Sequence, residues 1–235
     1  MKNNKPIIGI LAGMGPKSTA PFIDLVIEQC QKQYGAKNDI DFPHIIIYSL
    51  PTPFFVNKKL DDKEMKRVIS KGLQKLESAG VGFIAMPCNT AHKYFSSLQH
   101  SIKIPLLNII DSTTENINEK SQKVTLFATD QTIKADLYQS RMKKQKLRYV
   151  LKKEWQQEVN SLIVGVKKGE GQTKLLAITK RLSRFLKEDN IDTIIIVCTD
   201  LTKIVKTMKG FTLIDSSEAL AQKTIETYLK MQSTR

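Results

Sequence analysis

Two stretches of this chain, residues 82–92 (GFIAMPCNTAH) and 192–202 (DTIIIVCTDLT), follow the same plan. Each contains an apolar run and then changes abruptly to a cysteine followed by hydroxyl, amide or acidic residues. A short apolar run bounded by turn signals is typical of a strand buried on both faces. Each stretch therefore predicts a buried strand that ends at its cysteine, Cys88 or Cys198, and leads into a helix.

The two stretches belong to a longer internal repeat. Residues 105–112 (PLLNIIDS) have a counterpart in residues 211–216 (FTLIDS), and residues 9–13 (GILAG) have a looser one in residues 125–129 (TLFAT). The three matches occur in the same order and at similar spacings along the chain. Three ordered matches predict two similar lobes that carry their cysteines in equivalent places.

Short apolar runs rich in isoleucine and valine alternate with longer amphipathic stretches along the whole chain. This alternation is typical of βαβ units, whose parallel sheets are covered by helices on both faces. We therefore expect an α/β protein with two pseudo-symmetric lobes, each a parallel sheet flanked by helices, and an active site at the lobe interface. The expected lobes are residues 1–111 with 216–235, and residues 112–215.

The periodicity also gives approximate bounds for the elements. Strands are expected at 7–12, 44–49, 82–86, 106–109, 123–128, 193–198 and 212–214. Helices are expected at about 17–31, 63–79, 131–144, 155–167, 174–187 and 217–230.

The composition, with 41% hydrophobic and 26% charged residues among 235, is that of an ordinary globular protein. Its apolar runs are far shorter than the roughly 20 residues that span a bilayer. Lys2 and Lys5 precede the first run, as in a signal peptide, but Pro6 opens that run and glycines close it after about ten residues. A buried strand fits this pattern better, so we expect a cytoplasmic protein.

The net charge of +14 attracts anions, which include nucleic acids and acidic metabolites. The densest basic cluster, residues 141–148 (RMKKQKLR), has no interleaved aromatic residues and no recognisable nucleic-acid motif. We expect a solvated basic surface that helps to attract an acidic substrate, and neither nucleic acid nor a membrane as a partner.

Three cysteines are present: Cys30, Cys88 and Cys198. Their odd number and the lack of a secretory signal argue against a disulfide framework. Cys30 falls inside an expected helix, where a cysteine usually acts as a small buried hydrophobic residue.

Cys88 and Cys198 suit acid–base catalysis at a carbon atom. Ligands of open α/β sheets bind beyond the carboxyl ends of the strands, and a helix N-terminus there lowers the pKa of a thiol. Inversion of a stereocentre needs two groups of similar pKa on opposite faces of Cα, one as thiolate and one as thiol. Asn89, Thr90 and Thr199, with nearby backbone N–H groups, are placed to stabilise the resulting carbanion.

Signals for a bound cofactor are weak. Residues 13–19 (GMGPKST) follow an expected strand, but they lack the third glycine of a dinucleotide fingerprint. They also fail as a phosphate-binding loop, because Pro16 separates Gly15 from Lys17. We therefore expect no cofactor.

A metal site is also disfavoured. Cys88 and His92 are spaced as two ligands on one helical face would be, but Cys198 is the only obvious further ligand. We expect no metal, and we expect His92 to orient Cys88 or to donate a hydrogen bond.

These motifs together resemble the aspartate/glutamate racemase family. MPCNTAH (86–92) matches the family's first cysteine motif residue for residue, and VCTDL (197–201) resembles its second, which is usually GCTEL. Further segments that resemble the family are GILAGMGPKST (9–19), LFATDQTI (126–133), VKKG (166–169) and LIDSSE (213–218). The resemblance covers nearly the whole chain.

The resemblance implies a racemase that works without pyridoxal phosphate, is commonly a homodimer, and uses Cys88 and Cys198 as its two bases. Because both cysteines are kept, it favours racemisation of either enantiomer. The implied substrate-binding residues are Met14, Thr52, Asn89, Thr90, Thr129, Thr132, Lys167 and Thr199, and His92 and Asp200 support them.

One departure concerns the substrate. The family usually has a Pro-Asp-Arg segment whose arginine recognises a substrate carboxylate, but residues 51–60 (PTPFFVNKKL) contain no arginine. Lys58 or Lys59 can replace it, without the bidentate fork of a guanidinium group. Alternatively, Phe54 or Phe55 lines a pocket for a different side chain.

The leading hypothesis is therefore racemisation of aspartate or glutamate between a thiolate and a thiol. One alternative is a related decarboxylase, maleate isomerase-like enzyme or hydantoin racemase on the same scaffold. The other is a catalytically silent protein that binds an acidic metabolite or nucleic acid.

Overall fold

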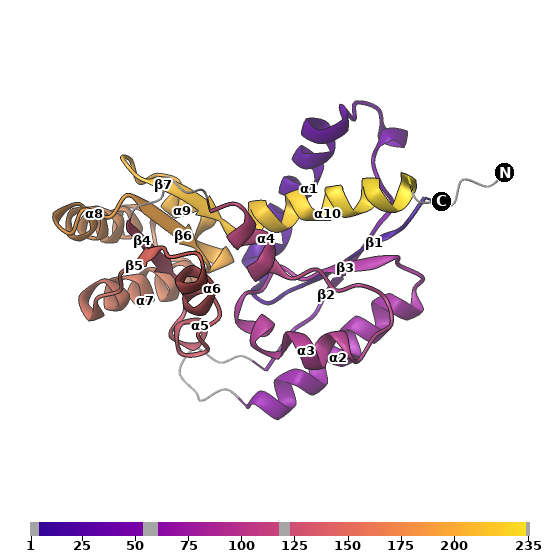
Figure 1. Ribbon diagram of the computed structural model, residues 1–235, viewed down its shortest axis with the longest axis horizontal. Helices are drawn as coiled ribbons and strands as arrows, with labels where there is room; N and C mark the ends of the chain where they lie inside the picture. Colours follow the sequence, from indigo (N-terminus) through magenta and orange to yellow (C-terminus); the bar gives the residue numbers. More distant parts are fainter. Residues whose placement is uncertain (1–4, 54–60, 118–122, 234–235) are drawn as a thin grey trace. The chain divides into compact units, whose positions relative to one another are not determined.

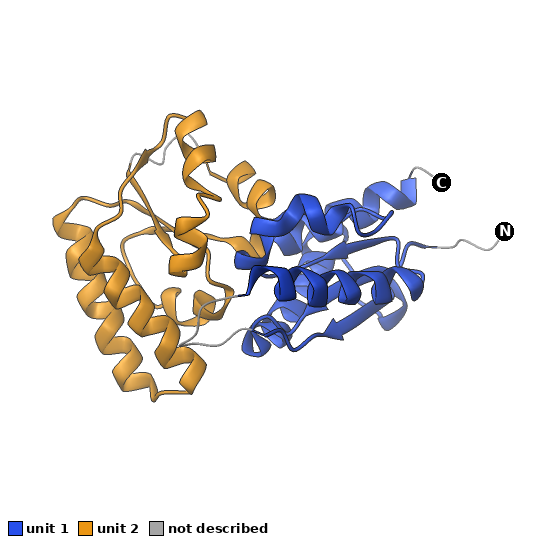
Figure 2. Cartoon of the chain, turned by 90° about the horizontal axis from the view of Figure 1, so that it is seen from below, with its two compact units in different colours: residues 1–109, 220–235 blue, residues 110–219 orange. Residues whose placement is uncertain are grey.

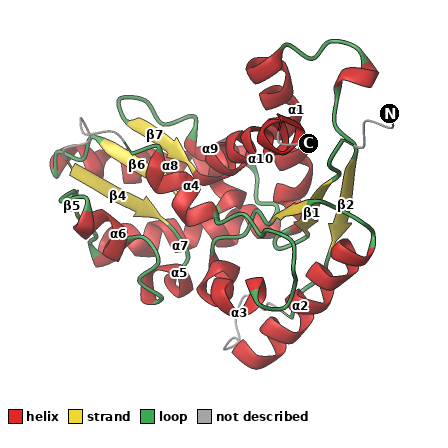
Figure 3. Cartoon of the chain, turned by 45° about the vertical axis from the view of Figure 1, so that its right-hand side comes forward, coloured by secondary structure: helices red, strands yellow, loops and turns green. Residues whose placement is uncertain are grey.

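The computed structural model describes residues 5–53, 61–117 and 123–233. The chain divides into two compact units (Figure 2), Met1–Ile109 with Leu220–Arg235, and Ile110–Ala219. Each unit contains a parallel sheet, drawn in yellow in Figure 3, with helices packed against it. The expected α/β class is confirmed, and the domain boundaries inferred from the sequence stay a prediction.

The first unit is built on a three-stranded parallel sheet in the order β2–β1–β3. Its strands are β1 (Ile8–Ala12), β2 (Ile45–Ser49) and β3 (Phe83–Ala85). Every residue of β1 and β3 is buried, whereas β2 is partly exposed because it lies at the edge of the sheet.

Helices cover both faces of this sheet (Figure 1). α2 (Asp62–Ser78) lies with α3 (Phe95–Gln99) on one side, and α1 (Thr19–Tyr34) lies with most of α10 (Ser216–Ser233) on the other. The side-chain amide of Gln33 in α1 donates to the carbonyl oxygen of Gln222 in α10 over 3.1 Å. The last helix of the chain therefore packs against the first.

The second unit is built on a four-stranded parallel sheet in the order β5–β4–β6–β7. Its strands are β4 (Lys123–Phe127), β5 (Arg148–Tyr149), β6 (Thr193–Ile196) and β7 (Thr212–Asp215). All of β6, with the sequence TIII, is buried, as expected for β-branched residues in an interior parallel strand. The two-residue β5 is too short to be predicted from hydrophobic periodicity.

The same strand order recurs in the two sheets. In the first unit a parallel bridge between Ile84 and Leu106 lies beyond β3, in the position that β7 occupies beyond β6. The expected strand at 106–109 is therefore reduced to a single bridge, because α4 (Ile109–Glu115) begins at Ile109. The shared order gives a structural basis for the repeat in the sequence.

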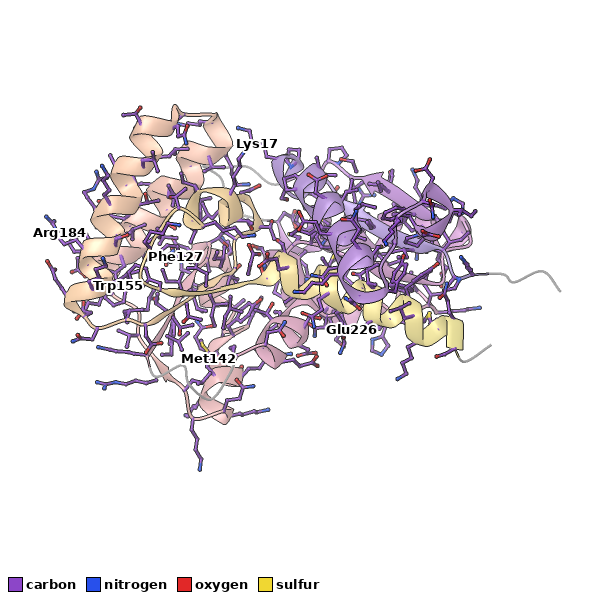
Figure 4. The ribbon with its side chains drawn as sticks, turned by 90° about the horizontal axis from the view of Figure 1, so that it is seen from above. Lys17, Phe127, Met142, Trp155, Arg184 and Glu226 are labelled. Atoms are coloured by element: carbon purple, nitrogen blue, oxygen red, sulfur yellow. The ribbon has the colours of Figure 1, made fainter. Side chains whose placement is uncertain are left out.

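Two long helices cover one face of the second sheet. The apolar faces of α7 (Lys153–Lys168) and α8 (Gln172–Glu188) bury a cluster that contains Phe127 and Trp155, both labelled in Figure 4. Phe127 is 1% exposed and Trp155 is 2% exposed, so these two rings lie inside the core. Arg184 lies on the solvent side of α8 (Figure 4), as its amphipathic pattern predicts.

The helix expected at 131–144 is two helices, α5 (Asp130–Lys134) and α6 (Gln139–Lys144). The helix is interrupted between them because Asp136 adopts a left-handed backbone conformation with a φ of 52°. The remaining short elements are α3 (Phe95–Gln99), α9 (Thr202–Val205), η1 (Pro16–Ser18), η2 (Asp39–Asp41), η3 (Thr90–Tyr94) and η4 (Thr199–Leu201), of which the four η elements are 3₁₀ turns.

Among the helices of the described residues, none has the length and apolar composition required to cross a membrane.

Candidate active site

Cys88 lies just beyond the carboxyl end of β3. Its backbone N–H donates to the carbonyl oxygen of Met86 over 2.8 Å, and its side chain packs at the edge of the apolar cluster of the first unit. The chain then enters η3, a five-residue 3₁₀ turn, instead of the α-helix that the sequence suggested. Such a short turn presents a smaller helix dipole to the thiol than a full helix would.

His92 fixes the turn that carries Cys88. The backbone N–H of Ile109 donates to Nε2 of His92 over 3.2 Å, which makes Nε2 an acceptor and assigns the ring proton to Nδ1. Nδ1 then donates to the carbonyl oxygen of Cys88 over 2.8 Å. The ring is 3% exposed, so it holds the backbone at Cys88 to the start of α4 inside the protein.

Asn89 and Thr90 follow Cys88 directly. Asn89 is 3% exposed and directly precedes η3 as its N-cap residue, where its carbonyl oxygen accepts a hydrogen bond from the N–H of His92 over 2.9 Å. Thr90 is partly buried. A buried amide and a hydroxyl group therefore lie next to Cys88 along the chain.

Cys198 occupies the corresponding place in the second unit, just beyond the carboxyl end of β6. Its backbone N–H donates to the carbonyl oxygen of Phe127 at the end of β4 over 2.9 Å, and the residue is 8% exposed. Its own carbonyl oxygen accepts from the N–H of Leu201 over 2.9 Å, which closes η4. Thr199, the next residue, is partly buried.

Lys167 and Asp200 form an ion pair beside Cys198 in the chain. Nζ of Lys167, in the last turn of α7, lies 2.6 Å from Oδ2 of Asp200, which is two residues beyond Cys198. The side chain of Asp200 is only 5% exposed and that of Lys167 is 23% exposed. The sequence marked both residues as site candidates but did not indicate that they pair.

Two threonines follow β4, the strand next to β6. Thr129 caps α5, because its Oγ1 accepts from the N–H of Thr132 over 3.3 Å and lies 3.0 Å from Oγ1 of Thr132. Gln156 of α7, which the sequence analysis missed, donates to the carbonyl oxygen of Ala128 over 2.9 Å. Nothing in the local sequence around Gln156 indicates this contact, since it joins a helix to a distant strand end.

The first strand ends in a turn that requires glycine. Gly13 has a φ of 89°, and a Cβ atom there would lie 2.6 Å from the backbone nitrogen of Leu50. The N–H of Gly13 donates to Oγ1 of Thr19 over 3.2 Å. Met14 then packs at the edge of the apolar cluster, and Thr52 is partly buried after β2.

Four residues considered as replacements for the family arginine or as pocket-lining groups, Phe54, Phe55, Lys58 and Lys59, lie outside the described residues.

A further polar cluster follows the first cysteine motif. Nζ of Lys93 and the hydroxyl group of Tyr94 both donate to Oδ1 of Asp62, each over 2.6 Å. The hydrogen bond from Lys93, followed by that from Tyr94, lowers the pKa of Asp62 below its usual value. Lys93 and Tyr94 directly follow MPCNTAH in the sequence. Their place next to the first cysteine motif could have indicated this cluster.

Within the described ranges, no group of three or more His, Cys, Asp or Glu side chains is arranged to hold a metal ion.

Comparison with known proteins places these features in a family. Residues 11–224 match the model of the family described as Asp/Glu/Hydantoin racemase. A curated protein of Bacillus subtilis (strain 168), the broad specificity amino-acid racemase RacX, is 44% identical over 228 residues, which are 97% of this chain and 100% of that protein.

Solved structures give the same result. The aspartate racemase of Picrophilus torridus is 26% identical, with a TM-score of 0.77 over 95% of this chain and 94% of that chain. An aspartate racemase homologue from Pyrococcus horikoshii OT3 is 27% identical, with a TM-score of 0.75 over 96% of this chain and 99% of that chain.

The fold and these comparisons define the class of protein as an amino-acid racemase, which is an isomerase. More narrowly, the chain belongs to the Asp/Glu/hydantoin racemase family.

Proposed function

We propose that this chain interconverts the enantiomers of amino acids by two-base catalysis, with Cys88 and Cys198 as the bases. The observation that carries the proposal is the equivalence of the two cysteines. Cys88 follows β3, which pairs with β1, and Cys198 follows β6, which pairs with β4. These two strand pairs occupy matching places in the two sheets. One group would suffice for proton removal alone, whereas inversion at Cα needs a second group on the opposite face.

In this scheme the thiolate of one cysteine removes the proton from Cα, and the thiol of the other delivers a proton to the opposite face of the carbanion. The C–H bond breaks as one S–H bond forms, and the second S–H bond breaks as the new C–H bond forms. The reverse reaction exchanges the two roles. The hydroxyl, amide and N–H groups of Asn89, Thr90 and Thr199 would stabilise the negative charge as it develops.

We further propose that Met14, Thr52, Thr129, Thr132 and Lys167 contact the substrate. Aspartate and glutamate are the first candidates, which the family description supports. The name of the 44% identical relative supports a wider range of amino acids. A homodimer in the cytoplasm and a reaction without pyridoxal phosphate are part of the same proposal.

The test is racemisation of a panel of pure enantiomers by the purified protein, without added pyridoxal phosphate. Aspartate, glutamate, asparagine and glutamine form a useful panel, because each acid has a neutral amide of nearly the same shape. Chiral chromatography should show both enantiomers of at least one substrate approaching equal amounts from either side. Maleate and a 5-substituted hydantoin in the same panel separate this activity from those of related enzymes.

The matched variants are Cys88→Ser, Cys198→Ser and Cys30→Ser. The first two should lose racemisation by about a hundredfold or more, since each removes one acid–base group, and the third should retain it. Wild-type protein that racemises nothing in the panel, or a Cys88→Ser or Cys198→Ser variant with the wild-type rate, would contradict the proposal.

A further inference from the structure

Asp62 links the first turn of α2 to the segment that follows Cys88. Its Oδ1 accepts hydrogen bonds from Nζ of Lys93 and from the hydroxyl group of Tyr94, each over 2.6 Å. Lys93 and Tyr94 are the last two residues of η3, the turn that the chain enters after Cys88. α2 also packs against α3, which continues directly from η3 (Figure 1). One carboxylate oxygen therefore joins α2 to the end of this turn.

Both donors are also held by other contacts. The ring of Tyr94 is 7% exposed and belongs to the apolar cluster of the first unit, against which the side chain of Cys88 packs. Met65, three residues beyond Asp62 in α2, belongs to the same cluster. Nζ of Lys93 lies 4.8 Å from the centroid of the Tyr94 ring, and the Lys93 side chain is 14% exposed. A shift of Asp62 would therefore move groups that pack in the same cluster as Cys88.

The two ends of the Cys88 turn are held by different neighbours. His92 holds the backbone of Cys88 to the start of α4. Lys93 and Tyr94 hold the other end of η3 to α2. A turn held at both ends leaves the thiol little freedom to move, and a displacement of about 1 Å can slow an enzymatic reaction by about a hundredfold.

We infer that Asp62 is a positioning residue for Cys88, which holds the end of η3 to α2 and so keeps the thiol where it can exchange a proton with Cα. This inference rests on the proposed function, because it assumes that Cys88 is one of the two bases. Asp62 acts through Lys93 and Tyr94 and takes no part in the proton transfers. Its carboxylate is 60% exposed, so its ion pair contributes little to stability and a variant should still fold.

The test is deuterium incorporation at Cα in variants that keep only one of the two proposed bases. In Cys198→Ser the incorporation depends on Cys88, and in Cys88→Ser it depends on Cys198. Asp62→Ala removes the acceptor of both hydrogen bonds from η3. Added to Cys198→Ser, it should slow incorporation by about tenfold or more, and added to Cys88→Ser by less than about twofold.

A general structural role of Asp62 would act on both bases alike. Equal slowing in the two backgrounds, or no slowing in either, would overturn the inference. Glu64→Ala is the matched control, because Glu64 is also an acidic residue in the first turn of α2 but pairs with Arg67 of the same helix. It should leave incorporation unchanged in both backgrounds. If it slowed the Cys88-dependent reaction as much as Asp62→Ala does, the link to η3 would not be the cause, and the inference would fail.

Amide hydrogen exchange followed by mass spectrometry separates this inference from the proposed function, because it needs no turnover. Asp62→Ala should speed exchange in the peptide that contains η3, whereas the peptide that contains η4 should exchange as in the wild type. A wild-type protein that racemises nothing contradicts the proposed function, but faster exchange in η3 would still support the link from Asp62 to the turn. Unchanged exchange in η3 would overturn that link and the inference with it.

Discussion

The ring of His92 donates a hydrogen bond to the carbonyl oxygen of Cys88 over 2.8 Å and accepts one from the N–H of Ile109 over 3.2 Å. The residue is 3% exposed, so water cannot easily replace either partner. His92 therefore joins the turn after β3 to the start of α4, and it acts on the backbone of Cys88.

The first prediction concerns the stability that this link provides. His92→Phe fills much of the same space but removes the two hydrogen bonds that the ring makes, to the carbonyl oxygen of Cys88 and from the N–H of Ile109. We expect a loss of about 2–4 kcal/mol in the free energy of unfolding, measured with urea, because removing one partner of a buried hydrogen bond costs about 1–3 kcal/mol for each bond.

His100 provides the matched control for this substitution. Its Nδ1 lies 2.6 Å from the carbonyl oxygen of Ser96, also four residues earlier in the chain, but the residue is exposed. His100→Phe should change the free energy of unfolding by less than about 0.5 kcal/mol. Equal effects of the two substitutions would show that burial of the His92 link is unimportant.

The second prediction concerns the glycine turn after β1. Gly13→Ala places a methyl group about where the backbone of Leu50 already lies, at a φ of 89°. Gly35→Ala also has a positive φ, of 72°, but no atom lies within 4 Å of the new Cβ. Gly35→Ala should cost about 1 kcal/mol through backbone strain alone, and Gly13→Ala clearly more, about 3 kcal/mol. The same cost at both positions would contradict the close contact with Leu50.

The third prediction is a pH dependence. Asp215 ends β7, is 4% exposed, and accepts a hydrogen bond on Oδ1 from the N–H of Ser217 over 2.7 Å. Burial, the largest effect, raises the pKa of Asp215 above its usual value, against the smaller opposing effects of the neighbouring Thr202 side chain and the N–H of Ser217. The native state therefore holds this proton more tightly than the unfolded chain does.

The direction in which stability changes with pH follows from that difference in proton affinity. The stability that protonated Asp215 contributes is present below about pH 4, the unfolded value, and is lost as the pH rises through the raised native value. Asp215→Asn keeps an oxygen that can accept from Ser217 and cannot ionise. Urea unfolding at pH 4 and pH 8 should show that the free energy of unfolding of the variant rises relative to that of the wild type at the higher pH. A constant difference, or the opposite trend, would be inconsistent with the raised pKa.

The fourth prediction concerns the third cysteine. Cys30 is 0% exposed within α1, and burial, the largest effect, raises the pKa of its thiol. A buried thiol that resists ionisation is a poor nucleophile. Native protein treated briefly with iodoacetamide at pH 8 should remain unmodified at Cys30 by peptide mass spectrometry, and Cys30→Ala should keep its racemase activity. Rapid alkylation of Cys30 in the folded protein would contradict its burial.

The long elements could be predicted because their patterns are strong. The helix expected at 63–79 is α2 at Asp62–Ser78, since an amphipathic period over many residues averages out local ambiguity. The break between α5 and α6 could not be predicted, because it depends on Asp136 adopting a left-handed conformation. Aspartate is also tolerated in helices, so its presence alone does not mark a break.

The repeat in the sequence singles out Cys88 and Cys198 as site residues, and this assignment stays a prediction. Their immediate contacts could not be predicted, because they depend on distant segments. Lys167 and Asp200 are 33 residues apart in the chain, and they meet only because α7 ends against η4. The same holds for His92 and Ile109, which are 17 residues apart. Such pairs are fixed by tertiary packing and leave no periodic signal in the sequence.

The central claim is that Cys88 and Cys198 serve opposite faces of one Cα atom, and hydrogen exchange in D₂O tests it most directly. Cys88→Ser and Cys198→Ser should each incorporate deuterium at Cα of one enantiomer only, without inversion, and the enantiomer should differ between the two variants. Wild-type protein should label both enantiomers. Labelling of the same enantiomer by both variants, or continued inversion by either at the wild-type rate, would contradict the two-cysteine mechanism.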